Sequence, residues 1–208
     1  MFKFKSNSTQ NQDLFILKVL DKKMNGTYLE IGANQPINDN NTYLLENEFN
    51  WKGVSIEWDI NLSNYFNIIR KNPCVAADAT TLNYTALLKL CDLPKHIDFL
   101  QMDIDPPDNT FKALNLIDFN EYSFSVITYE HDFYNGGHKE REESRKILES
   151  YGYTLVLADV MNDWMAFEDW YVNEKYMPND DWRLFIGEKQ PMDSQHLSQK
   201  YIDIFNTL

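Results

Sequence analysis

The sequence predicts an α/β protein in which a seven-stranded, mostly parallel sheet carries helices on both faces. Short apolar segments alternate with amphipathic ones along the chain, as in successive strand–helix–strand units. Several apolar segments are almost continuously hydrophobic, which is typical of parallel strands covered on both sides. The chain has 208 residues, of which 43% are hydrophobic, enough for one domain with its own core.

The chain begins with a polar segment. Residues 1–12 predict a flexible tail, and residues 13–208 predict a single domain. Apolar residues recur at helical spacing over 14–20 and predict a first helix, which ends near Lys22 and Gly26.

The remaining elements follow from hydrophobic period and turn residues. Seven apolar or β-branched segments predict strands, at 27–31, 53–59, 74–78, 97–105, 124–132, 154–160 and 182–188. Segments with apolar residues on one helical face lie between the first five strands, at 42–50, 62–69, 87–91 and 109–117. A charged amphipathic helix over 138–151, ending at Gly152, follows the fifth strand.

The composition excludes several classes of protein. With 19 Lys and Arg against 32 Asp and Glu, the net charge of −13 argues against binding nucleic acid or anionic membranes. No apolar run approaches the roughly 20 residues of a membrane span. No secretion signal is evident, and Cys74 and Cys91 lie in apolar contexts that suit reduced thiols. We therefore expect a cytoplasmic protein.

Ligands bind at the carboxyl ends of the strands in such a sheet. The first predicted strand contains Glu30 and leads into Gly32, which lets the backbone pass close to a ligand. The second strand carries Glu57 near its end, and a carboxylate can accept both hydroxyls of a ribose. The third ends in Asp78, which could accept the amine of adenine. Each residue alone also fits an ordinary turn or helix cap.

Taken together, these strand ends predict a nucleoside pocket. The sequence has no G-x-G-x-x-G and no G-K-S/T motif for a diphosphate. This combination favours S-adenosylmethionine over NAD or ATP, and the acidic residues complement its cationic sulfonium.

Four motifs stand in order between residues 26 and 59: Gly32-Ala33-Asn34, Asn41-Thr42 through Leu45-Glu46, Trp51-Lys52-Gly53, and Ile56-Glu57. This stretch resembles the opening of FkbM-type S-adenosylmethionine-dependent methyltransferases. Residues 99–105 and 124–132 look like the family's fourth and fifth strand motifs. Asp59 stands where the family usually has proline, and D-I-D-P-P-D-N at 103–109 replaces its D-V-E-G-x-E.

The resemblance implies a Rossmann-like class I methyltransferase fold whose last strand is antiparallel. It also implies S-adenosyl-L-methionine as cofactor and a sugar hydroxyl of a glycan or glycoconjugate, such as a deoxyhexose, as acceptor. The implied cofactor-binding residues are Glu30, Gly32, Asn34, Asn41, Glu57, Asp78 and Asp103.

Acidic residues also follow the fourth and fifth strands. Asp103 and Asp105 follow the fourth strand, and Glu130, His131 and Asp132 follow the fifth. An alcohol must lose its proton to accept a methyl group. One route is a Mg²⁺ or Mn²⁺ ion held by Asp103, Glu130 and His131, a pattern similar to metal-dependent sugar O-methyltransferases of macrolide pathways.

The other route needs no metal. His131 or Asp105 then acts as general base beside Asp103. A third interpretation is a set of solvated strand-end carboxylates with no chemical role.

Aromatic residues are interspersed with Asp and Glu over 161–182. Such a segment suits a sugar ring, so Trp164 and Trp170, with Asp105 and Asp132, are predicted to bind the acceptor. A cover over the core or an oligomer contact fits the same pattern.

The sequence thus predicts an S-adenosylmethionine-dependent O-methyltransferase with a carbohydrate acceptor. Two alternatives stay open: a non-catalytic binding or assembly domain with this fold, and a methyltransferase for a non-sugar small molecule. A homo-oligomer, or a module of a larger glycan-modifying protein, fits equally.

Overall fold

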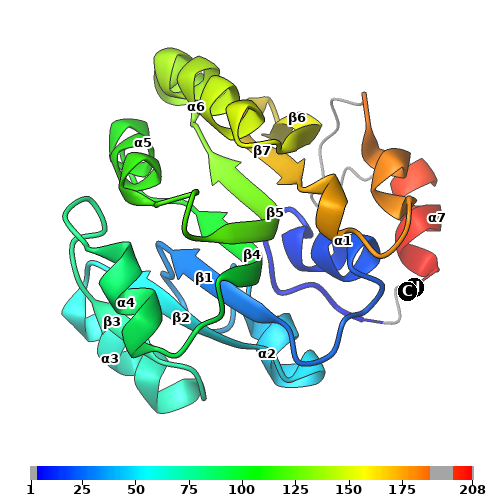
Figure 1. Ribbon diagram of the computed structural model, residues 1–208. Coiled ribbons are helices and arrows are strands. Elements are labelled where there is room, and N and C mark those ends of the chain that lie inside the picture. The colour runs from blue at the N-terminus through cyan, green and yellow to red at the C-terminus, as the bar shows by residue number, and fades with distance from the viewer. Residues whose placement is uncertain (1–3, 188–198, 208) are drawn as a thin grey trace.

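The computed structural model describes residues 4–187 and 199–207. A seven-stranded sheet runs through it in the order β3-β2-β1-β4-β5-β7-β6 (Figure 1). Strand β7 is antiparallel to both of its neighbours, and the pairs among β1 to β5 are parallel, as predicted. The strands are β1 (Thr27–Ile31), β2 (Lys52–Glu57), β3 (Cys74–Ala76), β4 (His96–Met102), β5 (Ser123–Glu130), β6 (Thr154–Asn162) and β7 (Met165–Val172).

Helices cover both faces of the sheet. They are α1 (Gln12–Val19), α2 (Tyr43–Phe49), α3 (Ile60–Ile69), α4 (Tyr84–Leu90), α5 (Pro107–Leu116), α6 (His138–Ser150) and α7 (Gln199–Asn206). Three short 3-10 helices are η1 (Phe133–Asn135), η2 (Glu174–Tyr176) and η3 (Asp181–Phe185). One core cluster joins the sheet to α1, α2 and η3, and a second joins it to α4, α5 and α6. Among the described residues no helix is both long and apolar enough to span a membrane.

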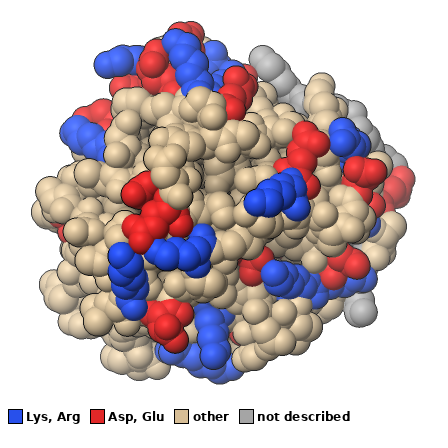
Figure 2. All heavy atoms as spheres, viewed as in Figure 1, with Lys and Arg blue, Asp and Glu red and all other residues tan. Residues whose placement is uncertain are grey.

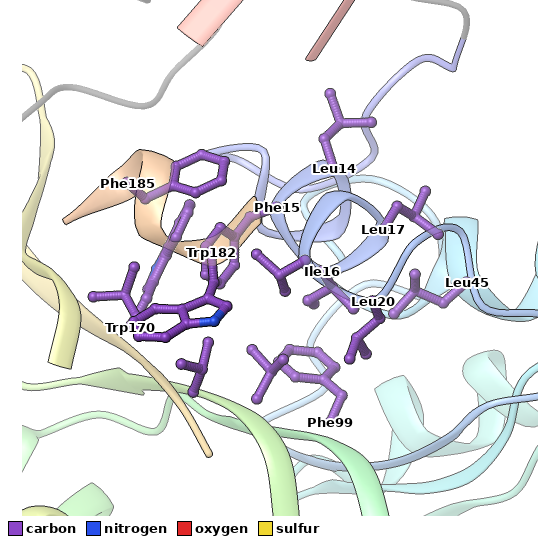
Figure 3. Packing of buried hydrophobic residues seen from close by; sticks show 14 of the residues in the cluster. Leu14, Phe15, Ile16, Leu17, Leu20, Leu45, Phe99, Trp170, Trp182 and Phe185 are labelled. Carbon is purple, nitrogen blue, oxygen red and sulfur yellow. The ribbon is translucent and has the colours of Figure 1, made fainter. Parts of the chain in front are cut away.

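The core around α1 corrects two predictions. Trp170 has no exposed surface, and its ring centroid lies 4.6 Å from that of Phe15 (Figure 3). Trp170 is therefore a core residue and is not available to an acceptor. In the segment 182–188, Trp182 and Phe185 belong to η3, pack into the same core, and form no strand up to residue 187. Within residues 4–187 and 199–207 the last strand is instead β7, and it lies inside the segment expected to link two strands.

The N-terminal residues are also more ordered than predicted. The backbone oxygen of Asn7 accepts a hydrogen bond from the backbone N–H of Asn40 at 3.1 Å. Asp13 is fully buried, and its carboxylate accepts the Ser6 hydroxyl at 2.6 Å and the Asn7 amide at 2.7 Å. These contacts fasten residues 6–12 onto the domain, where the sequence predicted a loose tail.

Candidate active site

Two cavities lie at the carboxyl edge of the sheet, one on each side of the end of β4. The first encloses about 330 Å³ and is lined by residues that follow β2, β3 and β4, including Trp58, Asp78, Asp105 and Asn109. The second encloses about 210 Å³ and lies over the ends of β4, β5 and β7. Its lining includes Asp39, Asn41, Asp103, Glu130, Asp132 and Tyr134.

Gly32 packs against the loop after β4, which lines both cavities. Its φ is +86°, and a Cβ there would lie 1.7 Å from the backbone oxygen of Asp103. Gly32 also donates its amide to the Ile56 oxygen at 3.0 Å, and Asp103 donates to the Ile31 oxygen at 2.9 Å. A glycine is required because the turn after β1 passes directly against the loop after β4.

Glu57 fixes the turn that follows Gly32. Its Oε2 accepts the Asn34 amide at 2.8 Å, and its Oε1 accepts the Asp59 amide at 2.9 Å. The side chain is only partly buried, so both oxygens keep lone pairs for a further donor. The structure therefore places Glu57 and Asn34 together in the turns after β1 and β2, and neither is among the described lining of the two cavities.

Asp78 lies in the first cavity, as the nucleoside prediction requires. Its Oδ1 accepts the Thr80 amide at 2.8 Å and the Thr80 hydroxyl at 2.6 Å, and these hydrogen bonds lower its pKa. The turn therefore favours the ionised carboxylate, which can accept a hydrogen bond from an amine.

Glu30 lies deeper than predicted and is not among the described lining of either cavity. Its carboxylate accepts the Ser55 hydroxyl at 2.6 Å, the Thr42 hydroxyl at 3.1 Å and the Asn40 amide at 3.1 Å. Burial raises the pKa of Glu30 to about 6. Glu30 thus supports the loop that carries Asn41 into the second cavity.

An acidic cluster occupies the second cavity and its rim. One carboxylate oxygen from each of Asp105, Glu130 and Asp132 lies within 4.8 Å of the other two. Burial and the neighbouring carboxylates raise the pKa values of Asp103, Glu130 and Asp132. Carboxylate oxygens arranged in this way could coordinate a hard cation such as Mg²⁺. They could equally accept hydrogen bonds from a bound group.

His131 does not join this cluster, so the predicted metal set of Asp103, Glu130 and His131 is not brought together; His131 instead groups with Asp159 and Asp169, and its burial removes it from the predicted role of base. It has no exposed surface, and its Nε2 lies 3.4 Å from Oδ1 of Asp169 and 3.7 Å from Oδ1 of Asp159. Arg145 binds both carboxylates, at 2.7 and 2.9 Å. Successive residues at a strand end point to opposite sides, so His131 ties the sheet to α6 while Glu130 and Asp132 reach the cavity.

Several lining residues were missed in the sequence. Trp58 is 75% exposed and lines the first cavity; its position directly after Glu57 was the available signal. Tyr134 and Phe167 line the second cavity. The predicted Trp164 is 75% exposed in the turn between β6 and β7, and its ring centroid lies 6.3 Å from that of Tyr134.

Glu168 lies opposite Glu130 in the β5–β7 register and is buried. It accepts hydrogen bonds from Gln12 at 3.2 Å and from the Trp170 indole. Burial, with the Asp103 charge nearby, raises the pKa of Glu168 to about 8 from its usual 4.5. Between these two values the folded state binds more protons than the unfolded state, so stability falls as pH rises.

We expect Glu168→Gln to flatten this dependence, because the amide keeps an acceptor oxygen but cannot ionise. Between pH 5 and pH 8 the native protein should lose up to about 1.4 kcal/mol per pH unit more than the variant. Urea unfolding at four pH values measures the difference. Parallel stability curves for the two proteins would contradict the assignment.

No family model matches the sequence, and no curated protein matches it significantly. Solved structures do match. A putative O-methyltransferase from Klebsiella pneumoniae has a TM-score of 0.53 at 16% identity, covering 78% of this chain and 80% of that one. An rRNA methylase from Streptococcus thermophilus has a TM-score of 0.52 at 12% identity, covering 82% and 98%. The S. pombe Dnmt2 methyltransferase has a TM-score of 0.51 at 16% identity, covering 70% and 48%.

At such identities the likeness shows the fold. The chain has the Rossmann-like fold of S-adenosylmethionine-dependent class I methyltransferases. The narrower resemblance to the FkbM type stays a prediction.

Proposed function

We propose that the protein is an S-adenosylmethionine-dependent methyltransferase whose cofactor lies across both cavities. The observation that carries this proposal is the pair of cavities at the carboxyl edge. Both are lined by the loop after β4, which places Asp103 in one and Ile104 and Asp105 in the other. When bound, S-adenosylmethionine supplies a methyl group activated by a cationic sulfur.

The residues divide between the two parts of this cofactor. Trp58 and Asp78 suit the adenine, because an indole can stack on the base and a carboxylate can accept its amine. Glu57 suits the ribose. Asn41 and Asp103 line the second cavity, where the methionine part and the sulfonium would lie.

The acceptor we propose is a hydroxyl of a carbohydrate. Tyr134 lines the second cavity with Asp132 and Glu130, and Trp164 packs against Tyr134 in a T-shaped contact; aromatic rings and carboxylates together suit a sugar. Asp105 or Asp103 would take the hydroxyl proton as the methyl carbon passes to the hydroxyl oxygen, its bond to sulfur breaks and a neutral thioether is left. No Lys, Arg or His is among the described residues of this cavity, and in Figure 2 basic side chains lie next to acidic ones without forming a continuous basic area. Both observations disfavour a polyanionic acceptor.

Methyl transfer from labelled S-adenosylmethionine to a panel of hexoses and polysaccharides tests this function. Label transfer to a sugar, with the methyl ether located by NMR, is the expected result. Cofactor binding without transfer to any acceptor would favour the non-catalytic alternative, and transfer to non-sugar compounds alone would favour the small-molecule alternative.

We expect Trp58→Ala to weaken binding of S-adenosylhomocysteine about tenfold. The exposed indole lines the first cavity, and loss of one stacking contact with a base costs about 1–3 kcal/mol. Calorimetric titration of both proteins measures the change.

Tyr65→Ala is the matched control, because Tyr65 is an exposed aromatic residue of α3 and not part of the described cavity lining. Its affinity should equal that of the unchanged protein. Equal affinities of all three proteins for S-adenosylhomocysteine would contradict the proposal that the adenine binds in the first cavity.

A further inference from the structure

Acidic side chains crowd together in the second cavity, and this crowding with burial raises the pKa values of Asp103, Glu130 and Asp132. Asp39, Asp103, Glu130 and Asp132 line it without a described basic residue. Arg145 and Arg141, in the ion-pair network behind β5, are already paired with Asp159, and Arg145 also with Asp169. The sulfonium of the proposed cofactor would bring one positive charge. Several carboxylates gathered in a partly closed site still favour a second cation.

Asp132 is a buried carboxyl group of this cavity whose hydrogen bonding is incomplete. It is 2% exposed, lines the cavity, and its Oδ1 has no hydrogen-bond partner among the described residues. Its backbone is fixed, since its amide donates to the Phe167 oxygen at 3.0 Å and its oxygen accepts from Asn135 at 2.8 Å and Gly137 at 3.1 Å. A buried carboxylate oxygen held in this way is costly unless a ligand donates to it.

The surroundings of Asp132 distinguish between two kinds of cation. Tyr134, Phe167 and Met165 line the same cavity, and Trp164 lies edge-on to Tyr134. A divalent metal ion takes oxygen ligands and water and gains nothing from aromatic rings or a thioether. An organic ammonium group uses both carboxylates and ring faces.

We propose that the acceptor carries a protonated amine, which binds to Asp132 beside the Tyr134 ring with Glu130 and Asp105 close by. Amino sugars have this chemistry together with the hydroxyls that the proposed function needs. The inference rests on the proposed function only in treating the bound molecule as a methyl acceptor, because recognition of the amine by these side chains does not require the cofactor.

The test is calorimetric titration with D-glucosamine and D-galactosamine against D-glucose and D-galactose, each with and without S-adenosylhomocysteine. At least one amino sugar should bind about tenfold or more tightly than its uncharged counterpart. Asp132→Asn should remove this difference, and asparagine tolerates the φ of 45° at this position. Tyr134→Leu should reduce the preference for the amino sugar.

Glu149→Gln is the control, because it removes one negative charge at an exposed position of α6 outside both cavities; the preference should survive it. Equal binding of charged and uncharged sugars, or no binding of either, would overturn the proposal. The proposal would also be overturned if Mg²⁺, added as MgCl2, bound through Asp132 and were required for an uncharged sugar to bind. If S-adenosylhomocysteine fails to bind while the amino sugar still binds through Asp132, the proposed function fails, whereas recognition of a protonated amine at Asp132 stands.

Discussion

Gly32→Ala is expected to destabilise the protein by about 3 kcal/mol and to abolish binding of S-adenosylhomocysteine. The new Cβ would lie 1.7 Å from the Asp103 oxygen and 2.8 Å from Ile104, and the φ of +86° strains any L side chain. Relief requires the loop after β4 to move, and that loop contributes to both cavities. Urea unfolding measures the first effect and calorimetry the second.

Gly152→Ala separates backbone strain from the close contact. Its φ of +85° is nearly the same, but its Cβ would meet nothing within 4 Å. A cost of only about 1–2 kcal/mol and unchanged ligand binding are expected. Equal losses of stability in the two variants would show that the contact between the two loops is unimportant.

Arg70→Met is expected to cost about 3–5 kcal/mol of stability. Arg70 is 7% exposed and donates to Glu46 at 2.8 Å, to Asn40 at 2.9 Å and to Thr42 at 3.0 Å. Methionine fills much of the space but leaves the Glu46 carboxylate, and the nearby Glu30 carboxylate, buried without their cation. Urea unfolding at pH 7 measures the loss.

Arg183→Met is the control for the loss of an arginine. Its side chain is 53% exposed and pairs with exposed Asp180 and Glu174, so a change of about 0.5 kcal/mol is expected. The double variant Arg70→Met with Glu46→Gln should recover part of the lost stability, because one stranded charge is gone. No recovery would mean that Arg70 stabilises the fold through packing alone.

The order of the elements could be predicted because each strand up to β5 is a short apolar segment bounded by turn residues. The 27–31 segment became β1 with the same bounds. The carboxyl ends of parallel strands lie at one edge of the sheet, so Glu57, Asp78 and Asp103 had to lie at that edge. This part of the candidate site follows from topology and needs no knowledge of side-chain direction.

Side-chain direction and burial are what the sequence could not supply. Whether His131 or Asp132 faces the cavity depends on the twist at the strand end, where Asp132 adopts a φ of 45°. Trp170 resembles a surface aromatic among acids, but its position in β7 turns it onto Phe15. An apolar run such as 182–186 fits a strand and a buried 3-10 turn equally well, and packing against α1 decided the outcome.

The loop after β4 has one residue, Asp103, in the second cavity and the next two, Ile104 and Asp105, in the first. A ligand that shifts this loop from one side must alter the affinity for a ligand on the other side, and thermodynamic linkage makes that influence equal in both directions. Groups bound in the two cavities can therefore influence one another through three consecutive residues, without hinge bending elsewhere in the domain.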